Sequence, residues 1–253
     1  MPVNALRGPL DGRFRRAGRI GCAAPACYRR PVKLAVVIPA LDEAEWIAGA
    51  VVSAAAPGVD VVVADGGSRD GTPDRAAVAG ARVVASAPGR ARQLQAGAQA
   101  SAGEALLFLH ADTRLAPGFA AGVGGALRDP AVVGGAFRLR FDRYTPSLRI
   151  VEWGARLRVA LFGLPYGDQA LFIRRSTLEA IGGIPQEPIM EDLDLVVAMR
   201  RRGRLAIVPL PAITSARRYL ANGVWRTMAL HWLAAGAWTL GVDRERIARW
   251  VRR

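Results

Sequence analysis

Four short apolar runs in the first half of the chain are the strongest constraint on its fold. Each run is long enough for one strand, and the segments between them carry apolar residues at helical spacing. The runs are LAVVIP (34–39), VDVVVAD (59–65), ARVVAS (81–86) and ALLFLHAD (105–112), and the segments between them are EAEWIAGAVVSAA (43–55), residues 72–79 and ARQLQAGAQAS (91–101). Strands that alternate with helices predict βαβ units, and therefore a parallel sheet that helices cover on both faces.

Two of these runs end on an aspartate, Asp65 and Asp112, although an apolar strand has no packing reason to end on a charge. In open α/β sheets, ligands bind beyond the carboxyl ends of the strands. Pro39 ends the first run in the same way, so three loops are expected to meet over one crevice. A chain of 253 residues can bury a sufficient core without disulfides or metals. The two aspartates therefore indicate a binding site.

The loop after the second run, GGSRDGT (66–72), has the composition of a turn that approaches a ligand. Gly66 and Gly67 allow close approach of the backbone, and the Asp70-Gly71 pair is a turn signal. By itself the loop is equally compatible with an ordinary turn between a strand and a helix. The segment after the first run, PALDEAEW, contains no glycine, which argues against a dinucleotide fingerprint, and the chain contains no P-loop sequence.

The combination VIPALDE, VVVADGGSRDGT and LLFLHADT, in this order, resembles the motifs of the family 2 nucleotide-sugar glycosyltransferases, over about residues 34–225. The resemblance implies an α/β fold of GT-A type: a Rossmann-type, mostly parallel sheet flanked by helices, in a single domain with C-terminal helices. It also implies a glycosyltransferase that moves a sugar from a UDP- or GDP-linked donor to a hydroxyl acceptor, with a Mn²⁺ or Mg²⁺ ion, and that inverts the anomeric centre.

The resemblance assigns the nucleotide-sugar site to the first two strand ends. Carried over to this chain, the family's nucleotide-binding positions are Pro39, Glu43 and Asp65, beside Gly67 of the following loop. The family's D-x-D motif, which holds the metal on the diphosphate, falls on the end of the fourth run.

That motif reads His110-Ala111-Asp112 in this chain, so its first acid is replaced. Asp112 offers the hard oxygen that Mg²⁺ and Mn²⁺ prefer. Two interpretations of His110 stay open: a ligand that shifts the preference towards Mn²⁺, or a hydrogen-bonding residue at the strand end.

The Glu191-Asp192 pair opens the segment EDLDLVVAMRRRG, and the resemblance implies that it supplies the catalytic base, with Asp192 in that role. Acceptor hydroxyls are poor nucleophiles until their proton is removed, so such an enzyme needs a base. The alternative is that Glu191, Asp192 and Asp194 are only acidic residues of the first turn of a helix.

Further candidates come from the remaining loops. The arginine fork suits phosphates, although a chain so rich in arginine also carries many as solvated surface charges. The candidates for the donor phosphates are Arg90, Arg92, Arg217 and Arg218, and those for the acceptor side are Gly167, Asp168 and Gln169, which precede an apolar strand.

The chain is strongly basic, with 35 lysines and arginines against 21 acidic residues and a net charge of +14. Such a charge favours contact with nucleic acid or anionic lipid, but a GC-rich codon bias would also enrich arginine. We expect no specific nucleic-acid partner. Residues 1–31 are expected to form a disordered basic arm, and Cys22 and Cys27 to be free thiols in a reducing, cytoplasmic compartment.

The transferase domain is expected to span residues 32–220, and an amphipathic basic helical segment residues 221–253. Within that segment, TMALHWLAAGAWTLGV (227–242) is too short to span a bilayer, which takes about 20 apolar residues. Its tryptophans and arginines fit either a helix at the inner membrane surface, where a lipid-linked acceptor would be reached, or a helix packed on the core.

Two other classes of function compete with glycosyl transfer. A nucleotidyltransferase or sugar-nucleotide pyrophosphorylase shares the sheet and the metal-bound aspartate, but it would carry a glycine-rich basic loop after the first strand, where this chain has PALDEAEW. The other class is a non-catalytic protein that binds RNA or membranes through its basic surface. Its binding would survive loss of Asp65, Asp112 and Asp192 and would collapse with added salt.

Overall fold

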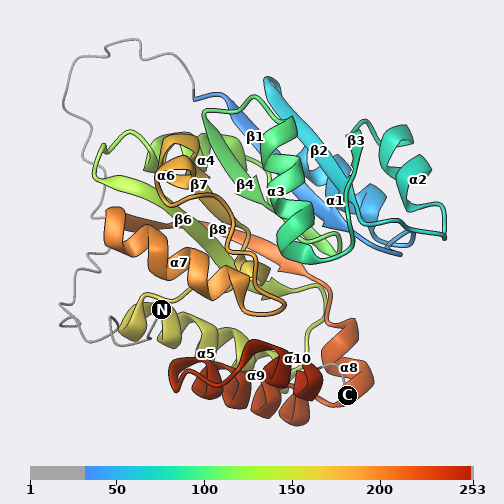
Figure 1. Ribbon diagram of the computed structural model, residues 1–253. Helices are drawn as coiled ribbons and strands as arrows, with labels where there is room; N and C mark the ends of the chain where they lie inside the picture. The colour runs from blue at the N-terminus through green and yellow to red at the C-terminus, as the bar shows by residue number, and fades with distance from the viewer. Residues whose placement is uncertain (1–31, 252–253) are drawn as a thin grey trace.

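The structure is a computed structural model that describes residues 32–251. Its centre is an eight-stranded mixed sheet with the strand order β3-β2-β1-β4-β7-β6-β8-β5 (Figure 1). The strands are β1 (Leu34–Ala40), β2 (Val59–Asp65), β3 (Arg82–Ala85), β4 (Ala105–Phe108), β5 (Thr113–Leu115), β6 (Val132–Phe141), β7 (Leu171–Arg174) and β8 (Arg204–Thr214).

The first half of the chain forms the parallel half of this sheet. β1 pairs in parallel with β2 and with β4, and β2 pairs in parallel with β3. β7 then enters antiparallel between β4 and β6, β8 runs parallel to β6, and β5 closes the edge antiparallel to β8. The predicted βαβ order and the mostly parallel α/β fold are confirmed.

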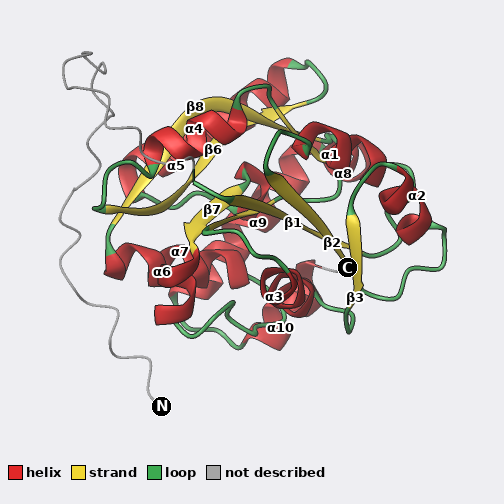
Figure 2. Ribbon diagram, turned by 90° about the horizontal axis from the view of Figure 1, so that it is seen from above, coloured by secondary structure: helices red, strands yellow, loops and turns green. Residues whose placement is uncertain are grey.

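Alternate residues of β1 contact helices on opposite faces of the sheet, because successive side chains of a strand point to opposite sides. Val36 and Ile38 pack with α1, α2 and α4, whereas Ala35 and Val37 pack with α3, α6 and α7 (Figure 2). These helices are α1 (Ile47–Ala54), α2 (Thr72–Val78), α3 (Arg90–Ala100), α4 (Phe119–Ala126), α6 (Arg175–Ala180) and α7 (Glu191–Arg202). All four β1 residues are fully buried, which explains why the strand reads as a continuous apolar run.

A second group of helices lies beyond the carboxyl ends of the strands, at the bottom of Figure 1. It consists of α5 (Pro146–Phe162), α8 (Arg217–Asn222), α9 (Val224–Thr239) and α10 (Arg244–Val251), and a short 3₁₀ helix, η1 (Gly167–Gln169), leads from α5 into β7. This helical group faces the edge of the sheet at which the sequence predicted a site. Among residues 32–251, no helix has both the length and the apolarity of a membrane span.

Two elements are shorter than the sequence predicted. The strand expected at 105–112 ends at Phe108, because the chain turns at His110, where the amide of Thr113 donates to the His110 carbonyl (3.0 Å). The helix expected at 43–55 begins only at Ile47. The amides before it, of Asp42, Glu43 and Ala44, donate to side chains of the loop after β2 instead of entering a helix.

The expectations for residues 1–31, including the disordered arm and the two cysteines, lie outside the described residues. The basic segment predicted after residue 220 folds into α9 and α10, which pack on each other through Ala234, Ala237 and Ile247.

Candidate active site

A cleft of about 710 Å³ lies at the carboxyl edge of the parallel strands. It is lined by the β1 end and its loop, the start of α3, the turn after β4, the loop before α7, and the segment that leads from β8 into α8. These segments are far apart in the sequence, and the parallel register brings them together because it places the ends of β1, β2 and β4 at one edge. The predicted residues that line it are Pro39, Glu43, Arg90, Arg92, His110, Asp112, Asp168, Glu191, Asp192, Arg217 and Arg218.

At the end of β1 in the cleft, one arginine joins two carboxylates. Arg217 donates to both oxygens of Glu43 (2.7 Å each) and lies 3.2 Å from Oδ2 of Asp112. Its guanidinium also lies 5.2 Å from the ring of Trp46. Burial raises the pKa of Glu43, and the ion pair with Arg217 opposes that shift. The β1 loop, the turn after β4 and the start of α8 are therefore held together by charge.

The Asp112 carboxylate has the accessibility and the donor atoms that a divalent ion needs. It is accessible from the cleft, with a side chain 19% exposed, and it supplies hard oxygen donors, which fit Mg²⁺ or Mn²⁺. Within residues 32–251, no three His, Cys, Asp or Glu side chains cluster as a complete ligand set. A metal at Asp112 would therefore complete its coordination with oxygens of a bound diphosphate, and the residues present fit that arrangement.

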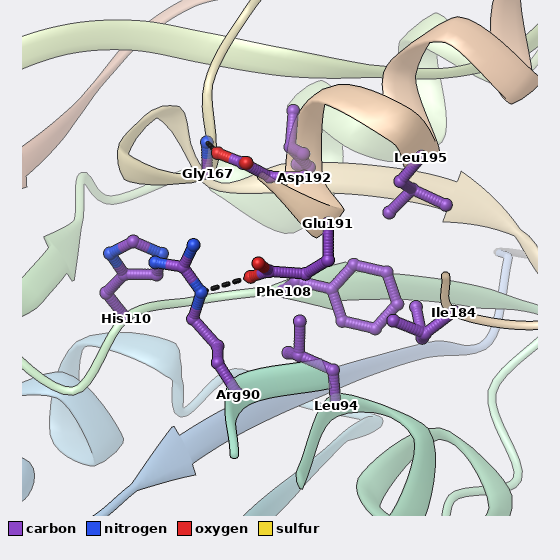
Figure 3. A pocket seen from close by; sticks show the side chains of 10 residues that line it. Arg90, Leu94, Phe108, His110, Gly167, Ile184, Glu191, Asp192 and Leu195 are labelled. Carbon is purple, nitrogen blue, oxygen red and sulfur yellow. Dashed lines mark hydrogen bonds and ion pairs between the residues drawn. The ribbon is translucent and has the colours of Figure 1, made fainter. Parts of the chain in front are cut away.

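His110 lies beside the guanidinium of Arg90 (Figure 3). Burial, together with the positive charge of Arg90, lowers the pKa of His110 to about 4. The imidazole is therefore neutral at neutral pH, with one nitrogen free to accept. This state is compatible with both interpretations of His110, as a ligand or as a hydrogen-bonding residue.

The two acids that open α7 point in different directions (Figure 3). Glu191 is only 2% exposed and pairs with Nε of Arg90. Burial disfavours the charge of Arg90, but Glu191 and then Asp192 outweigh it, so the pKa of the guanidinium is raised. Glu191 is thus committed to an arginine of α3.

Asp192 contacts the loop of Gly167, which the sequence predicted for the acceptor side. Its Oδ2 accepts a hydrogen bond from the amide of Gly167 (2.7 Å), and its Oδ1 accepts one from the amide of Leu193 (3.0 Å). A Cβ at residue 167 would lie 3.0 Å from Nε2 of His110 and 3.1 Å from Oδ2 of Asp192, so only glycine fits there easily. Since each carboxylate oxygen has two acceptor positions, Asp192 keeps the capacity to accept another proton donor.

The other two residues assigned to the acceptor side have separate environments. Asp168 lines the cleft, and its Oδ1 is buried without a hydrogen-bond partner among the described residues. Burial raises the pKa of Asp168 to about 6, although the nearby Arg158 opposes the shift. Gln169 is 2% exposed and bonds to the carbonyl of Phe137 and to Arg158. Gln169 therefore fixes the loop, and it does not line the cleft.

Asp65 and Gly67 organise a loop and are not among the residues that line the cleft. The Asp65 carboxylate accepts from the amides of Gly67 and Ser68 (2.9 and 3.0 Å) and from the Ser68 hydroxyl (2.5 Å). Gly67 has φ 95°, a conformation that favours glycine. Their assignment to the nucleotide remains a prediction.

Of the four arginines predicted to bind phosphate, the two not yet described have no carboxylate partner in the described part of the chain. Arg92 and Arg218 are both exposed and line the cleft, and neither forms an ion pair within residues 32–251. They are therefore available to a phosphate in a way that Arg90 and Arg217 are not.

Sequence reasoning missed three residues of this region. Buried Gln93 donates from Nε2 to the carbonyls of Ala40 and Ala64 (2.6 and 3.2 Å) and so joins the ends of β1 and β2. His231 of α9 lines the cleft and contacts the hydroxyl of Tyr219 (3.2 Å). Tyr166 lines it as well, stacked under Arg158 with 3.3 Å from the guanidinium carbon to the ring centre. The only available signal was that His231 is one of two histidines in the chain.

Comparison with known proteins gives a family match over more than half of the chain: residues 35–177 match the model described as Glycosyl transferase family 2. The matched region includes the β1, β2 and β4 ends and stops before α7. No curated protein gives a significant match. Of the functions considered from the sequence, the family match favours glycosyl transfer over a nucleotidyltransferase or a non-catalytic binding protein.

Several solved structures are similar in fold. Glucosyl-3-phosphoglycerate synthase from Mycobacterium tuberculosis, in complex with Mn²⁺, UDP and glucosyl-3-phosphoglycerate, is 23% identical, with a TM-score of 0.59 and coverage of 84% of this chain and 81% of that one. The mannosyltransferase PcManGT from Pyrobaculum calidifontis, in complex with GDP-Man and Mn²⁺, is 22% identical, with a TM-score of 0.63 and coverage of 81% and 63%. A mycobacterial protein is 27% identical, with a TM-score of 0.52 and coverage of 73% and 65%. The chain thus spans just under two thirds of the length of the last two.

Proposed function

We propose that this chain, which belongs to glycosyl transferase family 2, transfers a sugar from a nucleoside diphosphate to an acceptor hydroxyl with inversion at the anomeric carbon. The proposal depends mainly on one observation: Asp112 and Asp192, 80 positions apart, line the same cleft. Such a transfer needs a site for the leaving diphosphate and a base for the attacking hydroxyl. Two separate carboxylates can serve these two needs.

The donor is proposed to lie between the β1 end and α8. Asp112 would hold a Mn²⁺ or Mg²⁺ ion, which supplies positive charge to the leaving diphosphate when bound. Arg92 and Arg218, exposed and without an ion pair in the described chain, would contact the phosphates. The relatives above that contain UDP or GDP-Man also contain a metal, which supports a UDP- or GDP-sugar as the donor.

The base is proposed to be Asp192. The amide of Gly167 fixes one of its oxygens and leaves acceptor capacity towards the cleft. Glu191 is buried and paired with Arg90, so we assign it a positioning role: it holds the start of α7 against α3. The acceptor hydroxyl would then approach from the side of Tyr166, Asp168 and His231, which also line the cleft. A lipid-linked hydroxyl, reached at a membrane surface, is the acceptor class that we favour.

The test compares two neighbouring variants. Asp192→Asn keeps the shape of the side chain and removes its basicity, so turnover should fall by roughly 10² to 10⁴ while donor affinity stays the same. Glu191→Gln should instead weaken donor binding and lower stability, because it leaves Arg90 without its partner. Donor binding is followed by calorimetry, and turnover by transfer, or by donor hydrolysis where no acceptor is known.

Two results would contradict the assignment. Near-normal turnover of Asp192→Asn together with an inactive but folded Glu191→Gln would exchange the two roles. Full activity of both variants would show that the mechanism proposed for this site is wrong.

A further inference from the structure

The helical group beyond the sheet exposes an unusual number of large apolar side chains. We call the following residues the docking face: Ile150, Trp153, Leu157 and Leu161 of α5, Trp225, Trp232 and Leu233 of α9, and Leu240 just after α9. All are exposed, from 40% for Leu157 to 84% for Leu240. Apolar surface of this kind, concentrated on neighbouring elements, is typical of an interaction site.

Both helices are apolar on two sides. In α5, Leu148, Val151 and Ala155 pack on β6 and α8, whereas the exposed residues recur at the same helical spacing on the opposite side. In α9, Ala234 and Ala237 are buried against α10, whereas Trp232 and Leu233 are exposed. Each helix therefore exposes a second apolar side to water, which is unfavourable unless a partner covers it.

The two exposed sides lie in one layer of the molecule. α5 and α9 run side by side below the sheet in Figure 1, and the two helices are in contact. They share a core cluster in which Met228 and Val224 of α9 pack against Leu148 and its neighbours in α5. Because α5 packs on the sheet with one side, its exposed side points away from the sheet, and the docking face lies on the outside of this layer.

The charge around the docking face is positive. Glu152 is the only acidic residue in either helix, and it is buried and paired with Arg149. Arg156 and Arg226 are exposed within the two helices. On the neighbouring α10, Arg246 and Arg249 are exposed, beside one exposed acid, Glu245. No acidic side chain of α5 or α9 therefore opposes the approach of a negatively charged surface.

We infer that the docking face binds peripherally to the surface of an anionic lipid bilayer. Tryptophan, leucine and isoleucine side chains would enter the interface, and the arginines at the border would pair with acidic headgroups while their stems lie along apolar surface. The combination favours lipid over another protein because every exposed charged side chain of α5 and α9 is an arginine, on a molecule of net charge +14.

The position of α9 connects this surface with the proposed function. His231 and Ala234 line the cleft, whereas the adjacent Trp232 and Leu233 belong to the docking face. Docking would therefore bring one wall of the cleft to the lipid surface, where a lipid-borne hydroxyl is available. This last step depends on the proposed function, but the docking itself does not.

The experiment is sedimentation of the full chain with lipid vesicles. One set of vesicles contains phosphatidylcholine alone, and a second contains about one-third phosphatidylglycerol. We expect the chain to sediment with the anionic vesicles only, and to be released as the salt is raised from about 0.1 M to about 0.5 M. Trp232→Glu combined with Leu233→Glu, and separately Trp153→Glu on α5, should each weaken this binding by about tenfold or more.

The matched control is Val78→Glu, which places the same charge at an apolar residue of α2 that is 90% exposed and lies far from the docking face (Figure 1). It should leave vesicle binding unchanged. Circular dichroism and nucleotide binding of each variant, measured without lipid, establish that the fold and the cleft are intact.

Equal binding to both kinds of vesicle, or unchanged binding of the α5 and α9 variants, would overturn the inference. A wild-type dimer that these substitutions convert to a monomer, without any vesicle binding, would assign the face to a second copy of the chain and overturn it too. Vesicle binding that persists although the chain binds no nucleotide would leave the docking face in place and refute the proposed function instead.

Discussion

Single residues in the cleft differ in whether their charge already has a partner. Glu43 and Glu191 are each paired with an arginine, Arg217 and Arg90. Asp112 only shares the arginine of Glu43, at 3.2 Å. This distinction, rather than the presence of a carboxylate, separates a residue that can bind a ligand from a residue that holds the site together.

Asp112 provides the first prediction at this scale. Asp112→Ala should weaken nucleotide binding strongly in Mn²⁺ and little in EDTA, because a metal ligand matters only when the metal is present. Asp65→Ala should weaken binding equally in both, because its carboxylate holds the loop after β2. Calorimetry with UDP and GDP measures both effects, and equal losses for Asp112→Ala in the two buffers would exclude it as a ligand.

Asp168 provides a prediction about pH. Its pKa is raised from 3.8 to about 6 in the folded chain, mainly by burial, so the folded state binds the proton more tightly than the unfolded state does. The carboxyl is therefore tolerated below pH 4, and its ionisation destabilises the fold as the pH rises through 6, by on the order of 1–3 kcal/mol. Asp168→Asn should raise the free energy of unfolding at pH 8 relative to the wild type, and should do so by about half as much at pH 5.

Urea unfolding at the two pH values measures this difference. The exposed Asp74 of α2 supplies the control, since Asp74→Asn should have a similar effect at both. A gain for Asp168→Asn that is the same at pH 5 and pH 8 would contradict the role given to its ionisation.

At the scale of elements, the first turn of α7 joins three parts of the molecule. Glu191 reaches α3, Asp192 reaches η1, and Asp194 reaches the C-terminal helices. Asp194 accepts from Arg244 of α10 (3.0 and 3.1 Å) and from the indole of Trp238 of α9 (2.9 Å). If the three acids served only to offset the helix dipole, none of them would need a specific partner. Instead, each one contacts a different element.

Asp194→Asn should therefore loosen α9 and α10 from the rest of the chain. The ion pair with Arg244 is mostly buried, so its loss should cost about 1–3 kcal/mol, whereas Asp60→Asn, which breaks an exposed pair with Arg82, should cost less than about 1 kcal/mol. Hydrogen exchange should rise in residues 224–251 of the Asp194 variant and stay low in the central strands. Uniform exchange in both regions would contradict a local role.

At the scale of the whole molecule, the cleft is lined by the strand ends on one hand and by α9 and α10 on the other. Figure 1 shows the layer of C-terminal helices to which α9 and α10 belong. Acidic side chains concentrate at the cleft: seven of them line it, Glu43, Asp112, Asp168, Glu187, Glu191, Asp192 and Glu245. The outer layer of α5 and α9 exposes none. The net charge of +14 is thus distributed unevenly: seven acids lie at the cleft, where a metal and a hydroxyl would be handled, whereas the exposed charged side chains of α5 and α9 are arginines.

The sequence by itself determined the parallel half of the sheet. The runs at β1 and β2 are buried on both faces, so their composition alone marks them as strands, and helical spacing marks the segments between them. The positions of Asp65 and Asp112 at or just beyond strand ends followed from the same pattern. It also indicated that Asp112 and the start of α7 would belong to one site, although only through the resemblance to a family.

Only the tertiary structure decided what each of these side chains does. No local sequence pattern marks Gln93, His231 or Tyr166. Their positions in the site follow from the contact between the end of β1 and the start of α3, and from the placement of α9 along the cleft. Likewise, Glu191 pairs with Arg90 across 101 positions of the sequence, and Glu43 pairs with Arg217 across 174 positions. Strand and helix patterns arise from burial over neighbouring residues, which the sequence records, whereas hydrogen bonds and ion pairs depend on distances in space between remote segments, which folding alone sets.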